Sequence, residues 1–335
     1  MKITDFDYLL PEDLIAKRPL KERSSSRLLV VHRDGIIEHR MFPDIVTYLN
    51  AGDMLIVNNT KVFPARLTGM RENGKPLEIL LVKNLAKDAW EVLSKGRYTG
   101  ILLFSDDFSA ELHNGEVARF CYSGSFMENI WKYGAMPLPP YIKRLPDTSD
   151  KKTYQTAYAK QEGSIAAPTA GLHFNNFLLE KIKSKGIILR ELTLHVGVGT
   201  FKMIRTDYVE DHSMDSEYFE IPGSLFSEID LVRTSGRKVF AVGTTTTRAL
   251  EGYMSGNCVI TSQNGRIQGV TGMFIYPGYS FKVIDSLITN FHLPRSTPLM
   301  LASAICGRET LLKSYREAAA IGYRFLSYGD AMLIL

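Results

Sequence analysis

Residues 239–253 read VFAVGTTTTRALEGY, and this stretch decides the fold class. Four consecutive apolar residues, 239–242, predict a short strand that is buried on both faces. Gly243 and the threonines after it predict a turn, and residues 246–253 predict a helix. A buried strand that passes through a short turn into a helix is typical of layered α/β folds that contain parallel strands.

The same alternation extends to both sides of this stretch. From residue 150 onwards we expect helices at 175–186, 224–233, 299–305 and 310–321. Strands are expected at 187–194, 283–291 and 331–335. The first of these helices has Asn175 and Gly186 at its ends, which are common cap residues. Near the N-terminus, apolar runs predict strands at 28–31 and 54–57, with helical spacing at 42–49.

Residues 62–122 have a different character. Short apolar or alternating stretches recur there, separated by turn residues, at 62–68, 77–82, 89–93, 101–104, 108–112 and 116–122. This spacing predicts an antiparallel sheet or small barrel, which ends near Gly134, before the prolines of residues 137–140. The fold class we predict is a layered α/β domain built from both chain ends, residues 1–62 and 151–335, with an inserted antiparallel β-barrel domain at 63–150.

Composition excludes several classes of protein. The 335 residues are 45% apolar and 23% charged, as in ordinary globular proteins, and this length favours two domains. The three cysteines are far apart, which argues against a disulfide scaffold or zinc ribbon and predicts buried free thiols. No apolar run is long enough to span a membrane, and no secretory signal is evident, so we expect a cytoplasmic protein. The net charge of +4 permits a nucleic-acid partner without requiring one.

Four segments carry polar side chains where strands and turns meet. They read APTAGLHF at 167–174, LHVGVGTF at 194–201, VGTTTTRALE at 242–251 and ITNFHLP at 288–294. Ligands of α/β sheets bind beyond the carboxyl ends of strands, and histidine can exchange protons near neutral pH. Three of the segments carry a histidine, so together they predict one shared site at His173, His195 and His292.

Each segment taken alone also has a structural explanation. A histidine can cap a helix or be satisfied inside the core, and hydroxyls can cap a helix. Arg248 and Glu251 could form an ion pair on a helix surface, since they are three residues apart. Motifs for dinucleotides, for phosphate loops, for zinc hydrolases and for serine hydrolases are absent from the sequence.

Two stretches are rich in basic residues. Residues 17–33 hold six Lys or Arg against one acid, and residues 141–160 combine lysines and an arginine with tyrosines. Such stretches suit phosphate contacts and base stacking, although a solvated loop is the alternative for either one. The residues that we predict to bind nucleic acid are Arg18, Arg23, Arg27, Tyr141, Lys143 and Arg144.

Taken with three further matches, the four segments resemble one family, the S-adenosylmethionine:tRNA ribosyltransferase-isomerases of queuosine biosynthesis. The further matches lie at 5–16 with 26–30, at 137–142 with 154–156, and at 323–334. They span nearly the whole chain in the expected order. The resemblance implies an α/β domain with an inserted β-barrel. It also implies transfer and isomerisation of the ribosyl part of S-adenosylmethionine onto the 7-aminomethyl-7-deazaguanine at the tRNA wobble position. Epoxyqueuosine would form, and adenine and methionine would be released.

The resemblance also implies roles for the site residues. His173, His195 and His292 would supply a base, an acid and substrate orientation, in an order that the sequence does not assign. Substrate contacts would come from Thr169, Gly171, Thr200, Arg248, Glu251, Asn290 and Asp330. Arg248 among them would pair with a carboxylate or a phosphate. No cofactor, metal or protein partner is implied, because S-adenosylmethionine is consumed as a substrate and the partner is the tRNA.

Two of the departures from the family pattern bear on the site. Asn59 stands where an aspartate is common, and Asp215, three residues after His212, stands where a second histidine is usual. Asp215 can donate a proton at neutral pH only if its pKa is strongly raised, so we leave it out of the site. Two alternatives remain: a tRNA-binding module without catalysis, and a phosphoribosyl-type transferase, which the missing phosphate-binding motif disfavours.

Overall fold

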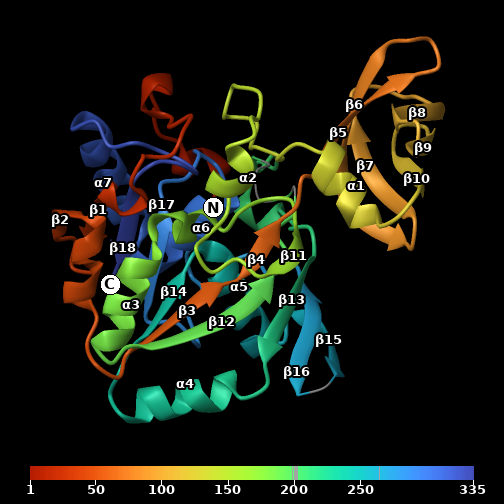
Figure 1. Ribbon diagram of the computed structural model, residues 1–335. Helices are drawn as coiled ribbons and strands as arrows, with labels where there is room; N and C mark the ends of the chain where they lie inside the picture. The colour runs from red at the N-terminus through yellow and green to blue at the C-terminus, as the bar shows by residue number, and fades with distance from the viewer. Residues whose placement is uncertain (198, 200–202, 264) are drawn as a thin grey trace.

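A ten-stranded mixed sheet forms the larger part of the molecule (Figure 1). The computed structural model describes residues 1–197, 199, 203–263 and 265–335. Across the sheet lie β15 (Cys258–Gln263), β16 (Arg266–Thr271), β13 (Glu217–Pro222), β12 (Ile188–Leu194), β3 (Met54–Asn58), β14 (Val239–Val242), β17 (Ser286–Asn290), β18 (Ala331–Ile334), β1 (Arg27–Val31) and β2 (Ile37–Met41). The four central strands β12, β3, β14 and β17 are parallel, so their carboxyl ends meet at one edge.

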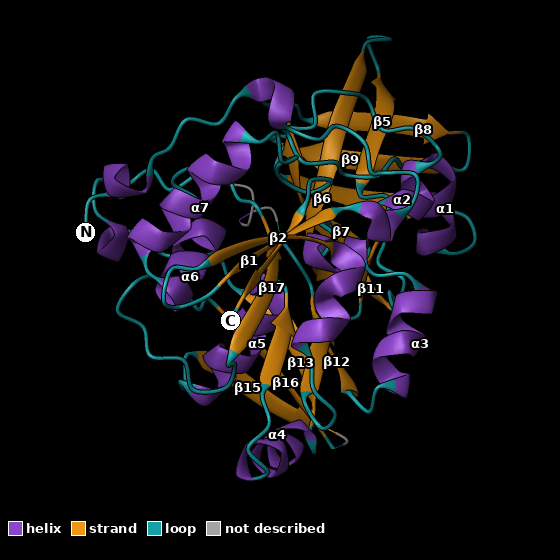
Figure 2. Ribbon diagram, turned by 90° about the vertical axis from the view of Figure 1, so that its left-hand side faces the viewer, coloured by secondary structure: helices purple, strands orange, loops and turns teal. Residues whose placement is uncertain are grey.

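Helices cover both faces of this sheet, which explains the unbroken apolar runs of its central strands. In β14, for example, Val239 and Ala241 pack into one core and Phe240 and Val242 into the other. One face packs against α3 (Asn176–Ser184), with short 3₁₀ turns beside it. The opposite face packs against α4 (Leu225–Thr234), α5 (Thr244–Met254), α6 (Thr297–Cys306) and α7 (Arg308–Ala320). Figure 2 shows α3 on the opposite side of the sheet from α6 and α7.

A closed antiparallel barrel stands beside the sheet (Figure 1). Its strands are β5 (Arg66–Arg71), β6 (Pro76–Ala86), β7 (Ala89–Ser94), β8 (Gly100–Ser105), β9 (Phe108–His113) and β10 (Val117–Tyr122). The helix α1 (Phe126–Tyr133) packs its buried Ile130 into the same apolar core as Leu102 and Phe108. The inward residues alternate along each strand, as the period of a half-buried strand requires.

The chain leaves the sheet for the barrel and returns from it along neighbouring paths. β4 (Thr60–Val62) leads out and β11 (Gln161–Ser164) follows the return, and the two pair in parallel. The short helix α2 (Asp150–Thr153) lies on the return path. The predicted fold class is therefore confirmed, whereas the domain limits at 62/63 and 150/151 stay a prediction.

Several element predictions needed correction. The predicted stretch 62–68 is split between β4 and β5, because Pro64 lies between them and cannot donate a hydrogen bond to a ladder. The helix after β14 begins at Thr244, two residues before the predicted start, and β2, β13, β15, β16 and α1 were not predicted.

Cys306 is buried as expected, but Cys121 is exposed because it points outward from the barrel strand β10. Within the described residues, no helix combines the length and apolar character needed to cross a bilayer.

We expect Gly134→Ala to destabilise the barrel. Gly134 ends α1 with ordinary backbone angles, yet an added Cβ would lie 2.1 Å from the carbonyl oxygen of Pro64. Overpacking against backbone should lower the free energy of unfolding by about 2–3 kcal/mol. Gly124→Ala is the control, since its Cβ would meet nothing closer than 3.9 Å and only its positive φ opposes the change, by about 1 kcal/mol. Equal losses for the two variants in urea unfolding would contradict the packing argument.

Candidate active site

A cleft opens at the carboxyl edge of the parallel strands. Its walls come from segments that follow β12, β14 and β17, from the 3₁₀ turn Thr169–His173, and from the loop before β18. Polar lining side chains include Thr169, Thr244, Thr289, Asn290, His292 and Ser327. None of the described lining residues is Asp, Glu, Lys or Arg. The cleft therefore offers neutral hydrogen-bonding groups in partly apolar surroundings.

The edge of the sheet is held by the amide of Asn58, the last residue of β3. Its Nδ2 donates to the Leu194 carbonyl (2.9 Å) and to the Thr245 hydroxyl (3.2 Å). Its Oδ1 accepts from the backbone N–H groups of Leu194 (3.0 Å) and Thr60 (3.1 Å). This fully buried side chain thus joins the end of β12, the start of α5 and the start of β4. Its polar atoms are all satisfied, as burial requires.

A second buried amide, Asn290 at the end of β17, joins the cleft wall to His173. Its Nδ2 donates to the Leu326 carbonyl (3.3 Å), which can only accept, so the orientation of the amide is fixed. The other proton of Nδ2 goes to Nε2 of His173 (3.0 Å), and Oδ1 accepts from the Thr169 hydroxyl (2.9 Å). His173 is therefore a neutral imidazole that carries its proton on Nδ1 and donates it to Ser26 (2.8 Å).

The surroundings of His173 oppose its charged form. Burial, followed by the positive charges of Arg324 and Arg23, lowers the pKa of His173 to about 3. The ring also packs on Phe42, with ring centroids 5.0 Å apart. Because both ring nitrogens are hydrogen-bonded, His173 acts on the cleft through Asn290.

His292 lies on the cleft wall itself, just after β17. Its Nε2 is 2.8 Å from the Thr289 hydroxyl, and burial lowers its pKa to about 3. The backbone of His292 is held from both sides, since its N–H donates to the Tyr315 hydroxyl (3.0 Å) and its carbonyl accepts from the Tyr8 hydroxyl. The imidazole is neutral at physiological pH and can accept a proton.

His195 occupies a different position, at the start of the loop after β12. Its Nδ1 is 2.8 Å from the Thr60 hydroxyl, and its ring stacks on Tyr218 at 5.5 Å. A Cβ on Gly163 would lie 2.5 Å from its Nε2, so β11 packs tightly against the imidazole. Burial lowers the pKa of His195, partly offset by Glu220. The neighbouring Val196 lines the cleft, but His195 is not among the lining residues.

Arg248 and Glu251 do not pair with each other, although both are buried on α5. Arg248 forms an ion pair with Glu217 and donates through Nε to the Met273 carbonyl (2.8 Å). Glu217 in turn accepts from the backbone N–H of Gly197 (2.9 Å). Glu251 accepts four hydrogen bonds, from the Tyr279 hydroxyl and from the backbone N–H groups of residues 282–284. Glu217 thus fastens the loop after β12 to β13, whereas Glu251 fastens residues 279–284 to α5.

Three more residues were predicted to contact substrate, and the structure describes two of them. Asp330 accepts from the backbone N–H groups of Arg27 (2.9 Å) and Arg324 (2.8 Å) and pairs with the Arg27 guanidinium. Gly171 is buried behind the cleft, where an added Cβ would lie 2.1 Å from the Tyr158 hydroxyl. Thr200 lies outside the described residues. The substrate contacts of these three residues stay predictions.

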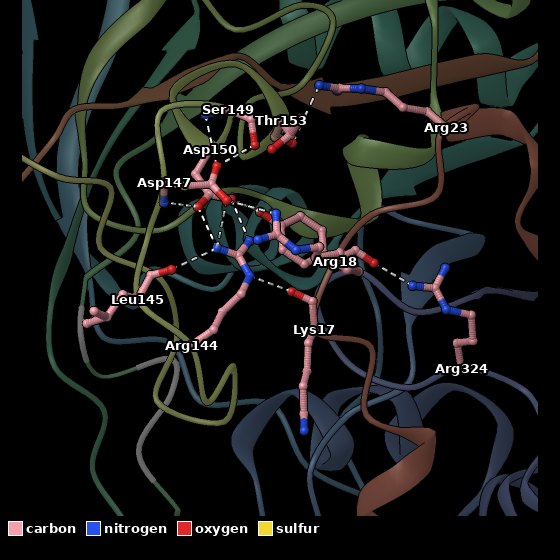
Figure 3. Close-up of polar contacts among 11 residues, drawn as sticks. Lys17, Arg18, Arg23, Arg144, Leu145, Asp147, Ser149, Asp150, Thr153 and Arg324 are labelled. Carbon is pink, nitrogen blue, oxygen red and sulfur yellow. Dashed lines mark hydrogen bonds and ion pairs between the residues drawn. The ribbon is translucent and has the colours of Figure 1, made fainter.

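The five basic residues predicted to bind nucleic acid separate into two groups, and Figure 3 draws three of them, Arg18, Arg23 and Arg144. Arg144 grips the buried Asp150 with both Nη atoms (2.7 and 2.6 Å) and donates to the Lys17 carbonyl (2.9 Å). Arg23 donates to backbone carbonyls of residues 152, 153 and 155, and Arg27 to those of residues 321 and 322. These three arginines brace loops. Arg18 and Lys143, by contrast, have side chains that are 59% and 61% exposed.

Sequence reasoning missed several supports of the site. Tyr8 and Tyr315 hold the backbone of His292, and Asn58 ties three strand ends together. Leu326, whose carbonyl fixes Asn290, has a positive φ of 68°, which is rare for a residue with a side chain. The position of Asn58 at the end of an apolar run was the available signal. No group of His, Cys, Asp or Glu within the described part of the chain is arranged to hold a metal ion.

Comparison with known proteins gives one consistent answer. The family model described as "Queuosine biosynthesis protein" matches residues 3–334. A protein of Thermodesulfovibrio yellowstonii named S-adenosylmethionine:tRNA ribosyltransferase-isomerase is 56% identical over the full length of both chains. One of the same name from Halothermothrix orenii is 48% identical, also over both full lengths. The crystal structure of a Thermotoga maritima S-adenosylmethionine tRNA ribosyltransferase is 34% identical, covers 99% of this chain and 100% of its own, and has a TM-score of 0.57.

The lowered pKa of His173 predicts a pH-dependent stability. The folded protein keeps this imidazole neutral down to about pH 3, whereas the unfolded chain protonates it near pH 6.5. Stability is therefore complete above pH 6.5 and is lost as the pH falls towards 3. His173→Gln should reduce the slope of unfolding free energy between pH 5.5 and 4 by about 1.4 kcal/mol per pH unit.

The matched control is Phe42→Leu, which removes the ring that packs on His173 but keeps the imidazole. This variant should be less stable than the unmodified protein and should retain its slope. Identical slopes for His173→Gln and the unmodified protein in urea titrations would contradict the prediction.

Proposed function

The chain belongs to the S-adenosylmethionine:tRNA ribosyltransferase-isomerase family of queuosine biosynthesis, and we propose that the cleft at the carboxyl edge of its sheet is the active site. The protein is an enzyme that transfers and isomerises the ribosyl moiety of S-adenosylmethionine onto the 7-aminomethyl-7-deazaguanine at the tRNA wobble position. The reaction gives epoxyqueuosine, and S-adenosylmethionine enters as a substrate that leaves as adenine and methionine. We place the reaction in the cytoplasm, together with the tRNA.

One observation carries the assignment of the cleft: its described lining holds no charged side chain. The sulfonium of S-adenosylmethionine acidifies the adjacent C5′ protons, and loss of one of them converts a cation into a neutral ylide. Transfer from water into a neutral, partly apolar site disfavours the charged form of an acid–base pair. The cleft would therefore favour the ylide over the sulfonium. An imidazolium at rest would repel the cation, and the low pKa of His292 keeps this imidazole neutral.

We assign His292 as the group that exchanges protons with substrate. It lies on the cleft wall and its imidazole is neutral, so it is the group that we propose takes up the C5′ proton; the burial that lowers its pKa keeps it uncharged and also makes it a weak base. Once protonated, an imidazole of such low pKa is a strong acid and would give its proton to the departing adenine. The acceptor amine of the tRNA base then forms a bond to a carbon of the ribosyl group and loses a proton, and the carbon–sulfur bond breaks so that methionine leaves.

Asn290 and Thr169 would orient the sugar, because both line the cleft and are hydrogen-bonded to each other. His173 is a positioning residue, since its Nε2 fixes the Asn290 amide from behind. The catalytic role of His195 stays a prediction, which the same experiment tests. The alternative of a tRNA-binding module without catalysis loses its support, because full-length relatives bear the name of an enzyme.

We expect His292→Ala to lower the single-turnover rate of adenine release by at least about 100-fold, the usual contribution of a general acid or base. The measurement uses S-adenosylmethionine and tRNA that carries the precursor base. His173→Ala should also lower the rate, and His173→Gln should restore part of it, because glutamine again offers an acceptor to Asn290. His195→Ala is measured beside them.

The control for these variants is His39→Ala on β2, whose side chain contacts Glu317 and Tyr323 outside the cleft. Its rate should equal that of the unmodified enzyme. Unmodified rates for all three of the variants at His173, His195 and His292 would show that the histidine assignment is wrong.

For the tRNA, we propose that exposed Arg18 and Lys143 contact phosphates, and that the ring of Tyr141, whose hydroxyl is hydrogen-bonded to Ser327 at the cleft wall, lies beside the bound base. The bracing residues Arg23, Arg27 and Arg144 would hold the loops that present these cations. The side chains of Arg18 and Lys143 pair with Asp147 and Glu12 at an exposed surface, where ion pairs are weak and easily exchanged for phosphate.

We expect Arg18→Ala and Lys143→Ala each to reduce the slope of log affinity for tRNA against log salt by about 1. Arg144→Ala should instead lower the melting temperature, because it leaves the buried Asp150 unpaired. Arg40→Ala is the control, an exposed arginine on β2 that pairs with Glu38. If Arg40→Ala changed the salt slope as much as the other two exposed variants, the location of the tRNA surface would be refuted.

A further inference from the structure

A second, smaller pocket adjoins the cleft at the start of α5. Thr244 and Pro298 line both this pocket and the cleft, so the two lie side by side. Its other lining residues are apolar with two exceptions, Arg248 and Thr297; the apolar ones are Met214, Phe274, Ile275 and Leu301. The pocket therefore combines a narrow apolar wall with one cation.

Only two of the three nitrogens of the Arg248 guanidinium are hydrogen-bonded to described residues. Arg248 is only 4% exposed, and two of its nitrogens are engaged, Nε by the Met273 carbonyl and Nη1 by Glu217. The third, Nη2, is buried and has no hydrogen-bond partner among the described residues. A buried charged donor without a partner is costly to the folded protein, so such an atom needs an explanation.

The N-terminus of α5 indicates which kind of group would accept a hydrogen bond from Nη2 of Arg248. This helix of eleven residues has no side-chain cap on its first N–H groups. The hydroxyls of Thr246 and Thr247 bond back to the carbonyls of Val242 and Gly243 and leave those N–H groups open. The positive end of the helix dipole and a free guanidinium N–H on the same helix both favour an anion.

We propose that this pocket is the subsite for the α-carboxylate of the methionyl part of S-adenosylmethionine, held by Arg248 and the first turn of α5. The proposal rests on the function proposed above. The methylene groups of the methionyl chain would lie against Met214, Ile275 and Pro298, and the ribose would extend into the cleft towards Asn290. A tRNA phosphate is disfavoured, because the pocket is small, mostly apolar and walled by a buried arginine. Released methionine carries the same carboxylate and would leave from this subsite.

The first experiment needs no variant. It compares the dissociation constants of S-adenosylmethionine and its decarboxylated analogue, which keeps the sulfonium, adenosine and amine, by calorimetry with the unmodified enzyme. A charge-assisted hydrogen bond to a buried guanidinium predicts binding of the analogue that is about 10- to 100-fold weaker. A difference below about threefold would overturn the proposal.

The second experiment separates recognition of the carboxylate from the bracing role of Arg248. Glu217→Gln breaks the ion pair but keeps Nη2, so its preference for S-adenosylmethionine over the analogue should stay near that of the unmodified enzyme. Adding Arg248→Met to this variant removes the guanidinium without leaving a buried carboxylate charge unpaired, and the preference should fall below threefold. An undiminished preference in the double variant would assign the carboxylate to another group.

Adenine release by the unmodified enzyme, with precursor tRNA and S-adenosylmethionine, tests the proposed function independently. Normal release together with equal affinity for the two compounds would refute the subsite alone. Absence of release would refute the function.

Discussion

Two buried asparagine amides hold together the edge of the sheet on which the proposed active site depends. Parallel strands bring their carboxyl ends to one edge, but each end then turns into an unrelated loop. Asn58 joins the turns after β3 and β12 to the start of α5, and Asn290 joins the end of β17 to the Thr169 turn and the loop at Leu326. An amide suits this task because it offers donors and acceptors without charge. An aspartate at either position would place a carboxylate against carbonyl oxygens.

The charged side chains near the cleft lie behind its described walls and not on them. The formal ion pairs lie behind the walls, where they fasten loops: Arg248 with Glu217, and Arg27 with Asp330. The walls themselves carry hydroxyls, amides and the neutral imidazole of His292. A neutral interior suits the proposed ylide chemistry, because a carboxylate on the wall would stabilise the sulfonium against deprotonation. The unsatisfied Nη2 of Arg248 is the one described place where the outer charges open towards the interior.

The sequence predicted the layered sheet, the inserted barrel and the segments of the site, because apolar runs and turn residues act locally. It could not predict which side chains would share a cleft. Asn290 and His292 are two residues apart and both line it, whereas His173 and His195 lie behind its wall and beside it. Partners distant in sequence decide this, such as Asp330 with Arg27, which are separated by 303 positions. Glu251 and Asp330 are the two carboxylates that were predicted to contact substrate, and both accept hydrogen bonds from backbone N–H groups that no motif reveals.

His195 contacts the two strands that connect the sheet to the barrel, unlike the other two histidines of the predicted site. β4 leads into the barrel and β11 leads out of it, and both contact this imidazole, through the Thr60 hydroxyl and the backbone at Gly163. Glycine is required there because any Cβ would overlap the ring. The residue after His195 lines the cleft and donates its N–H to Ser164, also in β11. β4 and β11, which connect the barrel to the sheet, therefore both touch the segment His195–Val196 that leads into the wall of the cleft. The barrel and this wall are thus joined through two short strands that pack on one ring.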